Sequence, residues 1–185
     1  MNITCFKPNI FPETKIISGV TQRNQEAFPP FGFSVHPADI YSQVTADKHL
    51  NLLAIEQKSD VKNFKCNKQT HSSTIVVMNK DTKSGEADGI ITKEKELYIY
   101  VKLADCAGIL IYDPEHELIA AVHSGWKGTS LNIAGKCVRK LKDEFHSSPS
   151  ELLIYISPAA SGKNYEIGPE VAECFPGFVV PKDNG

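Results

Sequence analysis

The sequence has no C-x-x-C pair, no H-x-H pair and no apolar run long enough to cross a bilayer. Its five cysteines are an odd number and lie far apart, whereas a secreted disulfide framework is even-numbered and dense. The N-terminus lacks the charged segment followed by an apolar one that marks a signal peptide. We therefore expect reduced thiols and a soluble, cytoplasmic protein.

Basic residues are not in excess either. The 20 lysines and arginines stand against 22 acidic residues, which gives a formal charge of -2 and a pI near 6.3. Proteins that bind nucleic acid or anionic membranes carry a basic excess or stripe, so neither partner is expected. The chain has 185 residues without repeats or a linker, and we expect one domain over residues 1–185. The sequence does not indicate an oligomeric state.

Strand patterns dominate the middle of the chain. Residues 107–112 and 117–122 are near-continuous apolar runs joined by Asp113-Pro114-Glu115-His116, which predicts a hairpin buried on both faces. Residues 97–103 alternate apolar and polar side chains, which is typical of a strand.

Helices are expected on either side of these strands. Thr45 is a suitable N-cap for a helix over residues 46–57, and Thr129 or Ser130 for a helix that ends near Phe145. Strands outnumber helices, and neighbouring strands are joined by hairpins. The fold class we expect is α+β, with a mixed, largely antiparallel sheet sandwich flanked by helices.

Cys106 and His123 are the first candidates for chemistry. Pairing the two arms of the predicted hairpin brings both residues to the same end of the sheet. This juxtaposition suits either a cysteine nucleophile with a histidine base, or two ligands of one metal ion. His71, considered alone in a polar loop, reads as a solvated histidine, and Asp88 as the start of a strand after a turn.

The segment that follows His123 is a glycine-rich connection to a helix. Gly125 and Gly128 allow a tight turn, and free N–H groups at a helix start near Thr129, together with Lys127, attract anions. The simpler interpretation is an ordinary strand–helix connection with a core tryptophan.

These fragments, taken in order, resemble the laccase-domain family, also called the multicopper polyphenol oxidoreductase family. The resemblance covers most of residues 18–175, and the combination of its pieces is specific. The matching pieces are Gly19-Val20-Thr21-Gln22-Arg23-Asn24, Gln69-Thr70-His71-Ser72, Ala87-Asp88-Gly89-Ile90-Ile91-Thr92, Ala104-Asp105-Cys106, Ala120-Ala121-Val122-His123-Ser124-Gly125-Trp126-Lys127-Gly128, Ile156-Ser157-Pro158 and Tyr165-Glu166-Ile167-Gly168-Pro169-Glu170-Val171.

The resemblance implies a metal site and a nucleoside chemistry. The family's metal ligands fall on His71, Cys106 and His123, and such a mixed N/S set suits Zn²⁺ with an open fourth position, with copper less favoured. Family activity is phosphorolysis of purine nucleosides (adenosine, inosine and methylthioadenosine), with adenosine deamination also attributed to members. The implied partners are therefore a purine nucleoside and phosphate. The implied fold is similar to the catalytic domain of cytotoxic necrotizing factors.

Roles for the other residues are expectations from the same resemblance and from charge. Asp105, with the three metal ligands, is expected among the catalytic groups, and Asp105 or Gln69 is expected near the base. Arg23, Lys127 and the helix start near Thr129 are the candidates for binding phosphate.

The chain also departs from the family pattern. Ser157-Pro158 stands where the family usually has Gly-Pro, and Lys163-Asn164 where it has a small residue before the Tyr-Glu pair. Family members continue beyond the position of Phe175 by roughly one further third. We therefore expect a single laccase-like domain that lacks the family's C-terminal segment.

Two other functions remain open at the level of sequence. A metal-independent cysteine hydrolase or deamidase would use Cys106 as nucleophile and His123 as base. A non-catalytic protein that binds zinc or a nucleoside would keep the site without turnover. A four-copper laccase fits poorly, because six histidines without an H-x-H pair do not supply its ligands.

Overall fold

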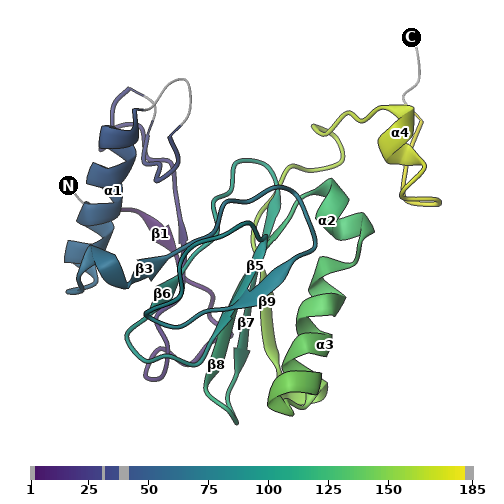
Figure 1. Ribbon diagram of the computed structural model, residues 1–185. Helices are drawn as coiled ribbons and strands as arrows, with labels where there is room; N and C mark the ends of the chain where they lie inside the picture. The colour runs from purple at the N-terminus through teal and green to yellow at the C-terminus, as the bar shows by residue number, and fades with distance from the viewer. Residues whose placement is uncertain (1–2, 31, 38–41, 182–185) are drawn as a thin grey trace.

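A computed structural model describes residues 3–30, 32–37 and 42–181 (Figure 1). Its elements, in chain order, are β1 (Cys5–Phe6), β2 (Val20–Thr21), α1 (Gln43–Glu56), the 3₁₀ turn η1 (Val61–Asn63), β3 (Phe64–Lys65), β4 (Ile75–Val77), β5 (Gly89–Thr92), β6 (Tyr98–Ile99), β7 (Ala107–Asp113), β8 (Leu118–Ser124), α2 (Trp126–Ser130), α3 (Ile133–Phe145), the 3₁₀ turn η2 (Pro149–Glu151), β9 (Leu153–Ile156) and α4 (Pro169–Ala172).

The central feature is a five-stranded sheet in the order β4-β5-β8-β7-β9. The β4–β5 pair is parallel and the other pairs are antiparallel, so the predicted mixed, largely antiparallel sheet is confirmed. Two further pairs, β1–β2 (antiparallel) and β3–β6 (parallel), form separate two-stranded sheets. The α+β class is therefore confirmed, while the likeness to the cytotoxic necrotizing factor fold stays a prediction.

One face of the sheet packs against α3 (Figure 1). The helix contributes Ile133, Cys137 and Leu141, all at most 1% exposed, to a shared core. The sheet residues of that core are Ile91, Ile109, Ile111, Leu118, Ala120 and Val122. Apolar residues that recur at helical spacing on α3 thus meet apolar residues that alternate along the strands.

The opposite face meets the N-terminal strand pair. Ile154 and Ile156 pair with Ile111 and Ile109 of the α3 face, so Tyr155 points to the other side. The Phe6 ring of β1 stacks on the Tyr155 ring with centroids 5.9 Å apart. The layers are therefore helix, sheet and N-terminal strands.

The hairpin of β7 and β8 has the predicted position. Its register runs from Ala107 opposite Ser124 to Asp113 opposite Leu118. Cys106 directly precedes this ladder and His123 lies one position inside its open end. The expectation that both residues reach the same end of the sheet is confirmed.

The predicted helix start near Thr129 is wrong. Helix α2 already begins at Trp126 after Gly125, and the Thr129 N–H donates to the Gly125 carbonyl at 2.9 Å instead of being free. Asn132, with a left-handed φ of 55°, separates α2 from α3, and its side chain accepts from the Gly135 N–H. A local Asn side chain thus outcompetes the continuous helix that the apolar pattern suggested.

Two other predicted boundaries also differ. Helix α1 is capped by Ser42, whose hydroxyl accepts from the Thr45 N–H, so the helix starts before the predicted Thr45 cap. The alternating segment over residues 97–103 is a strand only at Tyr98–Ile99. At Lys102 the backbone N–H donates to the side-chain oxygen of Gln69 and not to a neighbouring strand. Within the residues described, no helix is both long and apolar enough to cross a membrane.

The turn between β7 and β8 depends on Asp113, which is 2% exposed. Its Oδ1 accepts from the N–H groups of Glu115 and His116 at 2.9 and 3.2 Å, and its Oδ2 contacts the His116 Nδ1 at 2.8 Å. Burial by itself raises the pKa of Asp113, but hydrogen bonds from Ser147, His116 and Glu115 outweigh it and hold the pKa below its usual range.

We predict that Asp113→Ala lowers the free energy of unfolding by about 1–3 kcal/mol at pH 7, because two N–H groups of the turn lose a charged acceptor. Glu115→Ala, an exposed change in the same turn, is the control and should stay within about 0.5 kcal/mol. A carboxyl group whose pKa is lowered in the folded state stabilises that state above about pH 4. This stabilisation is lost as the pH falls through the lowered pKa. Urea unfolding at pH 7 and in acid should therefore show a difference between wild type and variant that shrinks in acid. Equal stability at pH 7 would contradict this role.

Candidate metal centre

Three potential metal ligands converge at the end of the sheet near α2. His71 comes from the loop before β4, Cys106 directly precedes β7, and His123 lies near the end of β8. One nitrogen of each imidazole and the Cys106 sulfur all lie within 4.8 Å of one another. The two imidazole rings meet edge to face with centroids 4.8 Å apart. The residues therefore share one small volume although they are far apart in sequence.

Strand pairing explains how Asp88, which directly precedes β5, comes to lie beside these three residues. Strand β5 lies between β4 and β8, with Gly89 opposite Val122. The His123 N–H donates to the Asp88 carbonyl at 2.7 Å, which continues the ladder by one step. Asp88 is thereby placed beside His123 and beneath the loop that carries His71.

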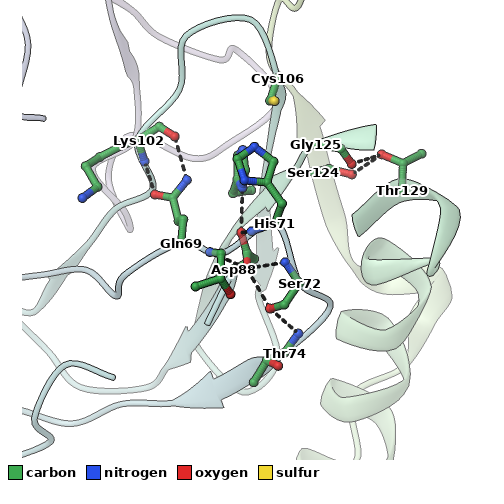
Figure 2. Close-up of polar contacts among 12 residues, drawn as sticks. Gln69, His71, Ser72, Thr74, Asp88, Lys102, Cys106, Ser124, Gly125 and Thr129 are labelled. Carbon is green, nitrogen blue, oxygen red and sulfur yellow. Dashed lines mark hydrogen bonds and ion pairs between the residues drawn. The ribbon is translucent and has the colours of Figure 1, made fainter. Parts of the chain in front are cut away.

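The Asp88 carboxylate binds several groups of the centre at once (Figure 2). It is fully buried and accepts the backbone N–H groups of Thr70, His71 and Ser72 at 3.2, 3.1 and 2.7 Å. It also accepts the Ser72 hydroxyl at 2.7 Å and contacts the His123 Nδ1 at 2.8 Å. One carboxylate thus orients two of the three candidate ligands.

These contacts keep Asp88 ionised. Burial alone raises the pKa of this carboxyl, but the hydrogen bonds from His123, Ser72 and Thr70 outweigh burial and lower the pKa below its usual range. An ionised carboxylate only accepts hydrogen bonds, so Nδ1 of His123 must carry the proton. In the neutral ring the other nitrogen, Nε2, carries the lone pair and is suited to bind a metal, as in carboxylate–histidine–metal arrangements.

The loop before β4 has the shape that an anion requires. His71 has a left-handed backbone with φ of 55°, which lets consecutive N–H groups point at one carboxylate. Gln69 ties the loop's start to the neighbouring chain: its amide donates to the Lys102 carbonyl at 2.8 Å and accepts the Lys102 N–H at 2.7 Å (Figure 2). Gln69 thus positions the loop, and its predicted contact with substrate stays a prediction.

Gly125 is required here by space. Its φ of -72° is available to any residue, so the tight turn expected from the sequence is not the reason for glycine. A Cβ at this position would lie 2.7 Å from the His71 Cδ2, 3.3 Å from the Cys106 sulfur and 3.5 Å from the His123 Cε1. The backbone of Gly125 therefore forms a wall against all three candidate ligands.

The donor set fits a single Zn²⁺ ion. Zinc in proteins takes thiolate at about 2.3 Å and imidazole at about 2.0–2.1 Å, so donors already within 4.8 Å of one another need only small movements. Burial, followed by the negative charge of Asp105, raises the pKa of Cys106. A bound cation is what would keep this sulfur as a thiolate. Two imidazoles and one thiolate also leave room for a further ligand.

A cavity of about 960 Å³ opens on one side of the centre. Cys106, Ala107 and the segment Ser124–Trp126 line it on the side of the centre, and residues of the segment 159–181 form much of the remainder. Of the residues predicted for substrate or catalysis, Asp105, Cys106 and Thr129 line it. The residues that do not line it are His71, His123, Arg23, Gln69 and Lys127.

Two features of this region were not predicted from the sequence. Asp88 lay inside the quoted motif Ala87-Asp88-Gly89-Ile90 but was interpreted only as the start of a strand. Lys163 and Tyr165 line the cavity, although the sequence marked Lys163 merely as a departure from the family pattern. The phosphate-binding roles of Arg23 and Lys127 stay predictions.

Comparisons with known proteins identify the family and relatives of this chain. The sequence profile of the family described as multi-copper polyphenol oxidoreductase laccase matches residues 18–181. A purine nucleoside phosphorylase of Clostridium acetobutylicum is 38% identical over 133 residues, which is 72% of this chain and 56% of the relative. The purine nucleoside phosphorylase YlmD of Bacillus subtilis is 27% identical over 183 residues, which is 91% of this chain and 65% of the relative. The chain thus spans between half and two thirds of the length of these two curated relatives.

Solved structures show the same fold. The hypothetical protein YfiH of Bacillus licheniformis matches with a TM-score of 0.78 at 25% identity, over 88% of this chain and 65% of that chain. A Neisseria meningitidis protein of the DUF152 family matches with a TM-score of 0.77 at 20% identity, over 95% of this chain and 70% of that chain.

We predict that Asp88→Asn weakens Zn²⁺ binding by about 10–100-fold, because the His123 ring loses the charged acceptor that fixes its tautomer. Competition with a chromophoric chelator measures the affinity, and circular dichroism checks the fold. Asp81→Asn, an exposed change of the same kind, is the matched control and should bind zinc like wild type. Unchanged zinc affinity in folded Asp88→Asn would contradict the role given to this carboxylate.

Gly125→Ala tests the wall behind the ligands. The added methyl group would displace His71 from its partners, so we expect zinc affinity to fall at least about 10-fold. Gly85→Ala is the matched control, since nothing lies within 4 Å of its Cβ position. The same chelator competition applies, and wild-type affinity in Gly125→Ala would show that the close approach is not needed.

Proposed function

Because this chain belongs to the multi-copper polyphenol oxidoreductase laccase family, we propose that it is a zinc-dependent purine nucleoside phosphorylase. The observation that carries the proposal is the convergence of His71, Cys106 and His123 beside a cavity of about 960 Å³ that Cys106 lines. That volume is in the range of small-molecule sites, and the two curated relatives above are named purine nucleoside phosphorylases. The substrates we propose are adenosine, inosine and methylthioadenosine, each with inorganic phosphate.

His71, Cys106 and His123 would hold the zinc ion, with Asp88 fixing the ring of His123 from behind. When bound, Zn²⁺ supplies a Lewis acid at the cavity wall that polarises an oxygen or nitrogen of the substrate. His71 is exposed and Cys106 is half-buried, so a substrate can reach these two residues from solvent.

The remaining steps belong to the chain's own side chains. In phosphorolysis the bond from ribose C1′ to purine N9 breaks, a phosphate oxygen bonds to C1′, and the departing purine takes up a proton. Asp105 lies on the cavity wall next to Cys106, where its carboxyl group is suited to orient the purine and to relay to it the proton that the attacking hydrogen phosphate gives up. Trp126 lines the same cavity and offers an aromatic face for stacking against the base.

Helix α2 and the end of β8 supply fixed hydroxyl groups. Thr129 Oγ1 donates to the Gly125 carbonyl at 2.9 Å and lies 2.8 Å from the Ser124 Oγ (Figure 2). Both residues line the cavity. We propose that these paired hydroxyls bind ribose oxygens, since they are already oriented before substrate enters.

We also propose that the same centre deaminates adenosine. It differs from phosphorolysis in needing water instead of phosphate, so adenosine incubated without phosphate would give inosine. A metal-independent hydrolase that uses Cys106 would instead survive removal of zinc and be inactivated by iodoacetamide.

We predict that removing zinc with a strong chelator lowers the rate of inosine phosphorolysis by at least about 100-fold, and that one equivalent of Zn²⁺ restores it. His71→Ala should have the same effect and bind less than one zinc per chain, because one of three ligands is lost. His36→Ala, an exposed histidine outside the centre, is the control. Chromatography of inosine, hypoxanthine and adenosine products measures all reactions at once.

The outcomes separate the candidate functions. Phosphorolysis that persists in the zinc-free protein would contradict the metal dependence. Zinc-loaded protein that binds inosine tightly and forms no product would contradict the phosphorylase and leave a nucleoside-binding protein.

A further inference from the structure

The charges that line the cavity are unbalanced. Asp105 and Glu166 are acidic, and the Cys106 sulfur adds negative charge once it is a ligand. Lys163 is the one basic residue among the cavity-lining residues that the structure describes. An anionic co-substrate that enters here meets repulsion from the carboxylates and attraction from this lysine and from the metal centre.

Lys163 is held near the centre by the backbone. The Ala160 N–H donates to the carbonyl of Asp105 at 2.9 Å, and Asp105 directly precedes the candidate ligand Cys106. The Asn164 N–H donates to the Ser161 carbonyl at 2.8 Å and closes a turn with Lys163 in its centre. The turn therefore presents Lys163 to the cavity on a segment tied to the metal centre.

The ammonium group of Lys163 is also available. Several lysines of the described chain are already paired: Lys62 with Asp60, Lys68 with Glu86, Lys95 with Glu117 and Lys140 with Glu144. Lys163 has no ion pair or hydrogen bond from its side chain to any residue that the structure describes. A cation without a protein partner on a cavity wall can bind a ligand without first giving up another contact.

The competing cation, Lys127, faces elsewhere. Trp126 and Thr129, three positions apart on α2, line the cavity, as expected for one face of a helix. Lys127 is not among the lining residues and is exposed on the remainder of the helix surface.

We propose that Lys163 forms an oxyanion subsite of this cavity, and that its ligand is the inorganic phosphate used in phosphorolysis. The proposal rests on the phosphorylase function proposed above. It assigns the phosphate contact to a residue at which this chain departs from the family pattern, so the subsite is a property of this sequence and not of the family motif.

Kinetics with Lys163→Gln test the assignment. Initial rates of inosine phosphorolysis should give a KM for phosphate about 10–100-fold above wild type, because a charge-assisted contact is lost, with the KM for inosine and the zinc content unchanged. Lys163→Arg should recover most of the loss, since a guanidinium also binds phosphate. Lys83→Gln, an exposed lysine outside the cavity, controls for the change in net charge. A KM for phosphate within twofold of wild type in Lys163→Gln would overturn the proposal, as would an increase seen in Lys127→Gln and not in Lys163→Gln.

A binding measurement separates failure of the subsite from failure of the proposed function. Titration of the zinc-loaded protein with inorganic phosphate, followed by ³¹P NMR or calorimetry, needs no turnover. If wild type has no phosphorylase activity but binds phosphate and Lys163→Gln binds it at least about 10-fold more weakly, the subsite stands and the function falls. If both proteins bind phosphate equally, the subsite falls whatever the activity.

Discussion

The site depends on one buried carboxylate. Asp88 gathers three backbone N–H groups, one hydroxyl and one imidazole, and these donors come from the loop before β4 and from β8. A buried charge is costly unless hydrogen bonds satisfy it. The hydrogen bonds that satisfy Asp88 therefore also fix the loop before β4 and the end of β8 around it. The same contacts fix the proton of His123 on Nδ1 and leave Nε2 for a metal. Asp88 thus both stabilises the local fold and orients the candidate metal ligands.

The strand order and register bring the candidate ligands to one end of the sheet, and local contacts then fix their orientation. The β7–β8 register brings Cys106 and His123 to one end, and β5 inserts Asp88 between that end and the His71 loop. Gly125 then closes the centre with backbone alone, because a side chain would meet all three candidate ligands. Cys106 and Gly125 line the cavity and Asp88 does not, so a small molecule in the cavity can approach Cys106 without contacting Asp88. Positioning of this kind suits a catalytic centre better than a buried structural one.

Much of this arrangement was predictable from the amino-acid sequence. The apolar runs about Pro114 predict the hairpin, and the hairpin alone predicts that Cys106 and His123 meet. The role of Asp88 was not predictable from its residue type, because its partners lie in a loop 16 to 18 residues away and in a strand 35 residues away. Gly125 and Gly128 suggested a turn, whereas steric contact explains Gly125 and a helix contains Gly128. The predicted helix start near Thr129 was wrong because the Asn132 cap, a local hydrogen bond, divides one apolar pattern between two helices.

X-ray absorption at the zinc edge of the purified, zinc-loaded protein tests the central claim most directly. The account predicts one zinc per chain with a single sulfur ligand at about 2.3 Å and two imidazole nitrogens at about 2.0–2.1 Å, and Cys106→Ser should remove the sulfur contribution alone. A coordination shell without sulfur in wild type, or one with several sulfurs, would contradict it.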